Sequence, residues 1–297
     1  MNINLAIVER ARAGEALTVA EIDELGTSDI LSLGMLADEV RRARVGDSVT
    51  YSRVLELAKG AQGAQGAQSA QSAQGAEVRI SVLPDTLDDA EALIAEARML
   101  AGPQLLTGFS LADIADRHWG KLTDVLKRLK RAGLDAIAEA PVDRLHDAEE
   151  ALKACQAADL PVRCLSLQSP ISGDGRSSWL VHLRDLVKKF PSIETVNPLS
   201  REQSIAVPTT GYEDVRAVAL ARLVLPSVKT IQVDWAQYGP KLAQVALTFG
   251  ANDLDRVSTV DDESLGHRRS PVEDIERQIR AAFAVPVRRN GRYERLS

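Results

Sequence analysis

Short apolar runs alternate with longer segments of helical periodicity along most of this chain. Runs rich in Val, Ile and Leu are typical of buried strands, and apolar residues at every third or fourth position are typical of amphipathic helices. Eight strands are predicted, at residues 49–57, 78–83, 104–110, 134–138, 162–167, 195–199, 229–235 and 254–259. Helices are predicted at residues 33–45, 87–100, 121–132, 148–158, 177–190, 212–225, 240–249 and 272–283. This alternation predicts an α/β fold, a (β/α)8 barrel of the TIM type with an N-terminal helix, as a single domain over residues 1–297.

The first β/α unit of the predicted barrel is degenerate. After the first strand, residues 60–76 read GAQGAQGAQSAQSAQGA, with Gly or Ser at every third position and no apolar side chain larger than Ala. Ala and Gln favour helix, but such a segment has no face to bury against a sheet. We therefore predict a flexible Gly/Ala/Gln-Ser linker at residues 60–76, where the first barrel helix is expected.

Composition and charge narrow the class of protein. Hydrophobic residues make up 45% of the chain and aromatic residues 4%, which predicts an aliphatic core. The formal net charge of −6 argues against nonspecific binding to nucleic acid or anionic membranes. No apolar run is long enough to span a membrane, and the first residues lack the apolar stretch of a secretory signal. Two cysteines do not indicate a disulfide framework, and the four histidines lack metal-ligand spacing. A cytoplasmic protein without a metal site is expected.

The C-terminal third carries a specific set of spacings. Asp214, Arg216, Ala219, Arg222, Leu223 and Leu225 fit the pattern D-x-R-x2-A-x2-R-L-x-L; Ile231, Gln232 and Trp235 fit I-Q-x2-W; and residues 244–254 read QVALTFGANDL. These spacings resemble the radical S-adenosylmethionine enzymes of the futalosine route to menaquinone. Those enzymes are aminofutalosine synthase and dehypoxanthine futalosine cyclase, together with the related synthase of the deazaflavin cofactor. Weaker sequence similarities to the same family, such as LADEVRRARVGDSVTY at residues 36–51, extend the resemblance over nearly the full length of the chain.

The resemblance also implies a cofactor site, and its central parts are missing here. In the family, a C-x3-C-x2-C loop after the first strand gives three thiolates to a 4Fe–4S cluster, which binds S-adenosylmethionine. This chain has no cysteine before Cys155, and residues 60–76 stand in place of the loop. The family's glycine pair after the second strand reads VLP at residues 82–84, and its G-G-T near the eighth strand reads DRV at residues 255–257. We therefore expect no cofactor.

Active sites of (β/α)8 barrels lie at the carboxyl ends of the strands. Six residues near these ends are candidate ligand-binding residues: Asp113, Glu139, Gln232, Trp235, Asn252 and Asp253. The resemblance supports all of them except Glu139, which is chosen as a polar side chain after the fourth strand. Structural alternatives remain, because Asp113 can cap a helix, Trp235 can pack at the barrel end and Asn252 can form a turn. No catalytic residue is predicted, although an acid/base pair of Glu56 and Glu139 is compatible with the fold.

Two functions remain open from the sequence. The first is a cluster-free homologue that acts in or alongside menaquinone biosynthesis as a partner, regulatory or ligand-binding subunit. The second is an enzyme with a changed, non-radical reaction, an isomerase, lyase or transferase acting on a futalosine-like nucleoside. Loss of the cofactor ligands beside a retained C-terminal pattern favours the first, and both predict a small polar ligand at the barrel mouth. The missing helix also predicts a cover over the first two strands, from a second copy, a cluster-bearing homologue or the helix at 33–45.

Overall fold

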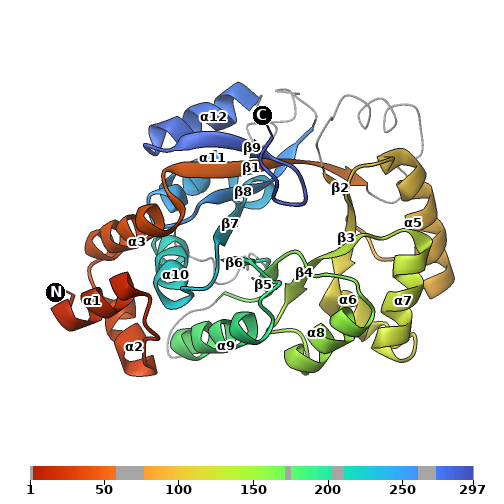
Figure 1. Cartoon of the computed structure of the whole chain (residues 1–297), viewed down its shortest axis with the longest axis horizontal. Helices are drawn as coiled ribbons and strands as arrows, with labels where there is room; N and C mark the ends of the chain where they lie inside the picture. Colours follow the sequence, from red (N-terminus) through yellow and green to blue (C-terminus); the bar gives the residue numbers. More distant parts are fainter. Residues whose placement is uncertain (1–2, 58–76, 171–174, 203–210, 260–271, 297) are drawn as a thin grey trace.

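Eight parallel strands close into a barrel in the computed structural model of the chain (Figure 1), which describes residues 3–57, 77–170, 175–202, 211–259 and 272–296. The strands are β1 (Ser48–Leu57), β2 (Glu77–Ile80), β3 (Leu106–Ser110), β4 (Ala136–Pro141), β5 (Leu165–Leu167), β6 (Thr195–Ser200), β7 (Thr230–Asp234) and β8 (Asp253–Ser258), followed by a ninth, β9 (Val285–Arg289). Neighbours pair in sequence order, and β1 pairs with both β2 and β8, which closes the barrel. The predicted fold class is confirmed.

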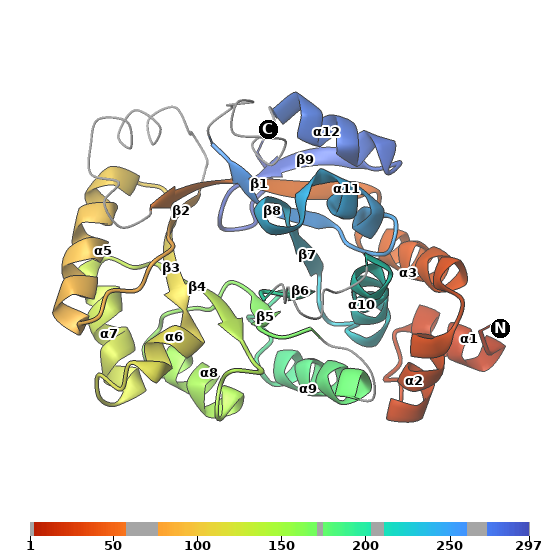
Figure 2. The same ribbon diagram turned by 180° about the vertical axis from the view of Figure 1, so that it is seen from behind.

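Helices surround the barrel on its outer side (Figures 1 and 2). They are α5 (Leu87–Ala101), α6 (Leu111–Asp116), α7 (Leu122–Ala132), α8 (Ala148–Ala157), α9 (Arg176–Lys189), α10 (Gly211–Val224), α11 (Trp235–Leu247) and α12 (Val272–Ala281). Three further helices, α1 (Leu5–Ala13), α2 (Val19–Thr27) and α3 (Ile30–Val45), precede β1. Several begin at side-chain caps, such as Asp147, which accepts from the Glu150 N–H before α8. Gly133, with φ 117°, ends α7, as left-handed glycines commonly do. The sequence did not predict α1, α2 or α6.

The apolar side chains of the strands face the helices, and the polar ones face the barrel axis. Along β7, Ile231 and Val233 belong to the hydrophobic core, whereas Gln232 between them lines the interior. Alternation on β8 is the same, with Leu254 in the core and Asp255 inside. Most (β/α)8 barrels fill their interior with bulky branched side chains. The aliphatic core predicted from composition therefore lies between the sheet and the helices, and the interior is left for polar groups.

β9 gives β1 a third neighbour. The N-terminal half of β1 pairs with β9, from Ser48↔Val285 to Ser52↔Arg289, while its C-terminal half pairs with β2. α12 packs on β9, and the Tyr51 hydroxyl on β1 donates to Glu276 Oε1 on α12 at 2.8 Å. α12 and β9 therefore cover part of the flank for which a second chain or the 33–45 helix was predicted. That helix, α3, packs against α10 instead (Figure 1).

The predicted linker at residues 60–76 lies outside the described residues. Among the described residues, no helix has the length and apolar character that a bilayer crossing requires.

Candidate functional site

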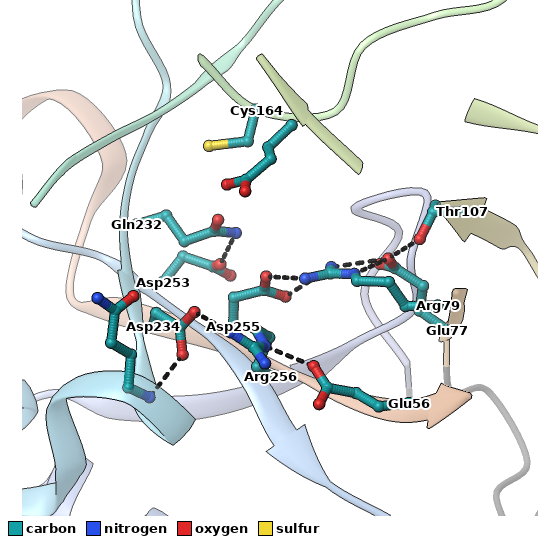
Figure 3. A network of polar contacts seen from close by, with 12 residues as sticks. Glu56, Glu77, Arg79, Thr107, Cys164, Gln232, Asp234, Asp253, Asp255 and Arg256 are labelled. Atoms are coloured by element: carbon teal, nitrogen blue, oxygen red, sulfur yellow. Dashed lines mark hydrogen bonds and ion pairs between the residues drawn. The ribbon is translucent and has the colours of Figure 1, made fainter. Parts of the chain in front are cut away.

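A cavity of about 510 Å³ lies inside the barrel, in the size range of small-molecule sites. Its lining comes from all eight barrel strands or from residues directly adjoining them, and from the C-terminal tail. Charged residues dominate it: Glu56, Glu77, Arg79, Asp113, Glu139, Arg163, Arg201, Asp255 and Arg256. Many of these side chains come from different strands and point toward one another (Figure 3).

Arg79 on β2 is held between two carboxylates (Figure 3). Its guanidinium lies 2.7 Å from Glu77 and 2.8 Å from Asp255, which stands on β8, on the other side of β1. The Thr107 hydroxyl also donates to Glu77, at 2.5 Å. Burial disfavours the charge of Arg79, but attraction to Asp255 and Glu77 outweighs it and raises the Arg79 pKa above its usual value. Arg79 is therefore a fixed cation that ties β2 to β8.

A second chain of ion pairs runs around the mouth of the cavity. Asp234, at the end of β7, accepts from Arg201 at 2.8 Å and from Arg256 at 2.9 Å. Arg201 also binds Glu139 at 2.6 Å, and Arg256 binds Glu56 at 2.5 Å. The hypothetical acid/base pair, Glu56 and Glu139, thus lines one cavity, but each carboxylate is engaged by a guanidinium. This arrangement gives no support to the acid/base hypothesis.

The deep end of the cavity, opposite the mouth, is built by Gln232 and the C-terminal tail. Gln232 Nε2 donates to Asp253 Oδ2 at 2.8 Å and reaches the Tyr293 hydroxyl at 3.2 Å. Arg289 binds both carboxylate oxygens of Asp253, at 2.6 and 2.7 Å. Arg163 Nη2 donates to the Gly291 carbonyl at 2.5 Å. Residues far apart in the sequence therefore meet at the amino ends of the strands.

Three of the six predicted ligand-binding residues line the cavity: Asp113, Glu139 and Gln232. Asp113 lies in the first turn of α6 and accepts from Arg144 at 2.7 Å. The other three, Trp235, Asn252 and Asp253, are not among the lining residues. Trp235 is 1% exposed at the start of α11, as the packing alternative predicted. Asp253 is fully buried beneath Gln232 and reaches the cavity only through its hydrogen bond to that residue.

Asn252 belongs to a structural clamp. Its Oδ1 accepts from Arg222 Nη2 at 2.6 Å and from the Ile231 N–H at 2.9 Å. Arg222, which is fully buried, also donates to the Gly250 carbonyl at 2.8 Å. A Cβ on Gly250, whose φ is +104°, would lie 2.9 Å from Arg222 Cβ, so only glycine fits. Much of the family-like spacing therefore locks α10 to the segments that enter β7 and β8.

Sequence reasoning missed the interior arginines and the tail. Arg79 lies within a predicted strand, where nothing in the sequence indicates that its side chain faces the barrel interior. Arg163 and Arg201 lie beside strands and belong to no recognisable catalytic motif. The tail did carry a signal, because residues 285–291 read VPVRRNG, an apolar run followed by an Asn-Gly turn dipeptide. That signal predicts a strand and a turn, but it gives no position relative to the barrel.

The residues present do not fit a 4Fe–4S cluster. Such a cluster requires at least three thiolates from the family's loop, and this chain has only Cys155 and Cys164. Cys164 lines the barrel cavity, while Cys155 lines a separate surface pocket beside α8. Burial raises the pKa of both thiols to about 12, which disfavours the thiolate form that a metal needs. Within the described residues, no cluster of three or more His, Cys, Asp or Glu side chains is arranged to hold a metal ion.

Residues 188–297 match the family model described as the CofH/MqnC C-terminal region. Among curated relatives, a 5-amino-6-(D-ribitylamino)uracil–L-tyrosine 4-hydroxyphenyl transferase 2 of Methanosarcina mazei is 43% identical over 30% of this chain and 24% of its own length. The corresponding 4-hydroxyphenyl transferase 1 of Methanosarcina acetivorans is 27% identical over 98% of this chain and 93% of its own length. The first of these alignments thus spans about a quarter of the relative. Together they show that the C-terminal third of the chain is similar to this family model and that the chain as a whole is distantly similar to these transferases.

Solved structures share the fold. Methylornithine synthase (PylB) superposes with a TM-score of 0.68 at 13% identity, covering 95% of this chain and 97% of that protein. The FeFe-hydrogenase maturase HydG from Carboxydothermus hydrogenoformans gives a TM-score of 0.64 at 14% identity, covering 95% of this chain and 79% of that protein. At these identities the likeness concerns the barrel fold alone.

Proposed function

We propose that this chain is a cluster-free homologue of radical S-adenosylmethionine enzymes that binds a neutral, polyhydroxylated heterocycle inside its barrel. The observation that carries this proposal is the pairing of charges around the cavity. Arg79, Arg201 and Arg256 each contact two carboxylates, so the lining has little net charge to attract an ion. Paired guanidinium and carboxylate groups still offer many donors and acceptors, which suit hydroxyl groups.

The curated relatives favour a particular ligand within this class. Their names place 5-amino-6-(D-ribitylamino)uracil among their substrates, and this compound carries a polyhydroxylated chain on a heterocyclic base. A futalosine-like nucleoside of the menaquinone route has the same two parts and is the second choice. We propose a ligand-binding or partner role beside a cluster-bearing homologue, because the chain lacks the thiolates for its own cluster. The ion-paired state of Glu56 and Glu139 gives the alternative of a changed enzyme no support.

Isothermal titration calorimetry tests the ligand class. The probes are 5-amino-6-(D-ribitylamino)uracil, inosine as a neutral nucleoside, and inosine monophosphate as its anionic counterpart. We expect one-to-one binding of a neutral probe and weaker binding of the phosphate. Ala236→Phe places a ring in the cavity lining and should abolish binding, whereas Ala95→Phe on the exposed face of α5 should not. Failure of every neutral probe, or unchanged binding by Ala236→Phe, would refute the proposal.

Size-exclusion chromatography with light scattering tests the partner role. The chain is measured alone and mixed with a C-x3-C-x2-C homologue from the same organism. A complex of defined mass supports a partner subunit or a homo-oligomer. A chain that stays monomeric and forms no complex with the homologue would refute the partner role and leave ligand binding as the remaining role.

A further inference from the structure

The C-terminal tail is wedged into the amino end of the barrel. After β9, the Asn290 side chain accepts from backbone N–H groups two and four residues further on, at 2.8 and 3.0 Å, which fixes a tight turn. Gly291 sits at the tip of this turn. A Cβ there would lie 2.8 Å from Leu105 and 3.1 Å from Glu77, so the backbone touches β2 and the entry to β3. The tail is therefore part of the cavity wall.

This wedge holds Tyr293 in one position at the deep end of the cavity. The guanidinium carbon of Arg289 lies 4.1 Å from the Tyr293 ring centroid, and that of Arg163 lies 4.7 Å from it. Two cation–π contacts on this half-buried ring constrain its orientation. Burial raises the pKa of Tyr293, so its hydroxyl keeps its proton at neutral pH.

The hydrogen bonds at this end fix the orientation of the Gln232 amide. Asp253 is bound by Arg289 on both oxygens, so it is a carboxylate and can only accept. Gln232 must therefore turn its nitrogen toward Asp253, and the same nitrogen also donates to the Tyr293 oxygen. Both amide N–H groups are then used. Gln232 Oε1 remains as an acceptor, and the Tyr293 O–H remains as a donor with no hydrogen bond to another described residue.

We propose that Tyr293 is a specificity-determining residue, because its O–H and Gln232 Oε1 form a donor–acceptor pair at the deep end of the cavity. This pair is complementary to a ligand edge with a carbonyl next to an N–H, as in a uracil or purinone ring. A ligand without that edge leaves a buried polar group unpaired, which sites of this kind reject strongly. The inference rests on the proposed function, since it concerns the same cavity.

Paired probes test this inference. Wild type, Tyr293→Phe and the matched control Tyr212→Phe, whose tyrosine is 70% exposed on α10, are titrated with 5-amino-6-(D-ribitylamino)uracil and with its N1,N3-dimethyl analogue. The analogue has lost both ring N–H groups, so no ring carbonyl has a ring N–H beside it. We expect wild type to bind the parent compound about tenfold or more tightly than the analogue. Tyr293→Phe should bind the parent compound roughly tenfold more weakly than wild type does, and its affinities for the two probes should differ less. The control should behave as wild type.

The outcomes separate the two proposals. Binding by wild type with unchanged affinity and preference in Tyr293→Phe would overturn this inference and leave the proposed function standing. Failure of wild type to bind either probe, together with inosine, would overturn both. If Tyr293→Phe does not fold, Gln232→Met replaces it. Gln232→Met removes the acceptor in a similar volume, and it too should narrow the preference; an unchanged preference would again overturn the inference.

Discussion

Removal of Arg289 should destabilise the barrel more than removal of any exposed arginine. Arg289 and Asp253 are 1% and 0% exposed at their side chains, and the guanidinium binds the carboxylate at 2.6 and 2.7 Å. Within the part of the chain that the structure describes, Arg289→Met would leave the buried Asp253 carboxylate with hydrogen bonds from Gln232 and Thr50 alone. Breaking a buried pair from one side typically costs about 3–5 kcal/mol. The lost cation–π contact with Tyr293 adds roughly 1–2 kcal/mol.

Urea unfolding at neutral pH, followed by far-UV circular dichroism, measures this effect. The matched control is Arg277→Met, because Arg277 binds Asp274 at the same 2.6 Å while the two side chains are 69% and 33% exposed. An exposed pair contributes about 0–1 kcal/mol, so the control should unfold near the wild-type midpoint. Equal midpoints for Arg289→Met and Arg277→Met would show that the tail is not anchored by this pair. That result would also remove the structural basis for placing Tyr293 in the cavity.

Three further predictions concern cofactor, thiols and pH. Anaerobic reconstitution with iron and sulfide should give a colourless protein after desalting; a brown protein with about four irons per chain, held by its thiols, would contradict the cluster-free assignment. At pH 8, Cys155 and Cys164 should react with a thiol reagent roughly a thousandfold more slowly in the native than in the guanidinium-unfolded protein, since burial raises their pKa to about 12; equal rates would contradict their burial. Burial opposes the charge of Asp255, but the attraction of Arg79 and Arg289 outweighs it and lowers the Asp255 pKa in the folded protein. The carboxylate therefore stabilises the fold at pH values above its pKa in the unfolded chain, about 3.9, and this stabilisation is lost as the pH falls below that value. Asp255→Asn should therefore unfold at lower urea at pH 7 and lose less stability than wild type on acidification, and a parallel pH profile would count against this account.

The barrel could be predicted from sequence because its strands bury apolar side chains against helices. All eight predicted strands are present, with boundaries that differ by a few residues. β9 was not predicted, because it is a short strand that leaves Val285 more than half exposed and its apolar pattern is therefore weak. α1 and α2 also bury few residues, at Ile7, Ala11, Ile22 and Leu25. Elements at the periphery of the fold carry the weakest periodicity.

The site was predictable only in part, for a geometric reason. Strand alternation indicates that Gln232 and Glu139 lie near the barrel axis or mouth, but it does not indicate which carboxylate meets which guanidinium. Arg79 and Asp255 are 176 positions apart, and they meet because the barrel closes between β8, β1 and β2. Arg201 and Tyr293 come from segments after the strands, whose paths depend on the whole fold. Pairing of this kind becomes visible only in three dimensions.

The retained C-terminal spacing should be interpreted through the contacts that its residues make. Arg222, Gly250 and Asn252 form the clamp that locks α10 to the entries of β7 and β8, and none of them lines the cavity. Loss of Arg222 or Asn252 would leave a buried amide or guanidinium without its partner, and a side chain at Gly250 would clash with Arg222, so the barrel needs all three whatever it binds. Gln232 is different, because it lies on the same stretch and faces the cavity. Similarity in this region therefore reports barrel architecture first, and among its residues Gln232 is the one that connects it to the cavity and to the ligand proposed for it.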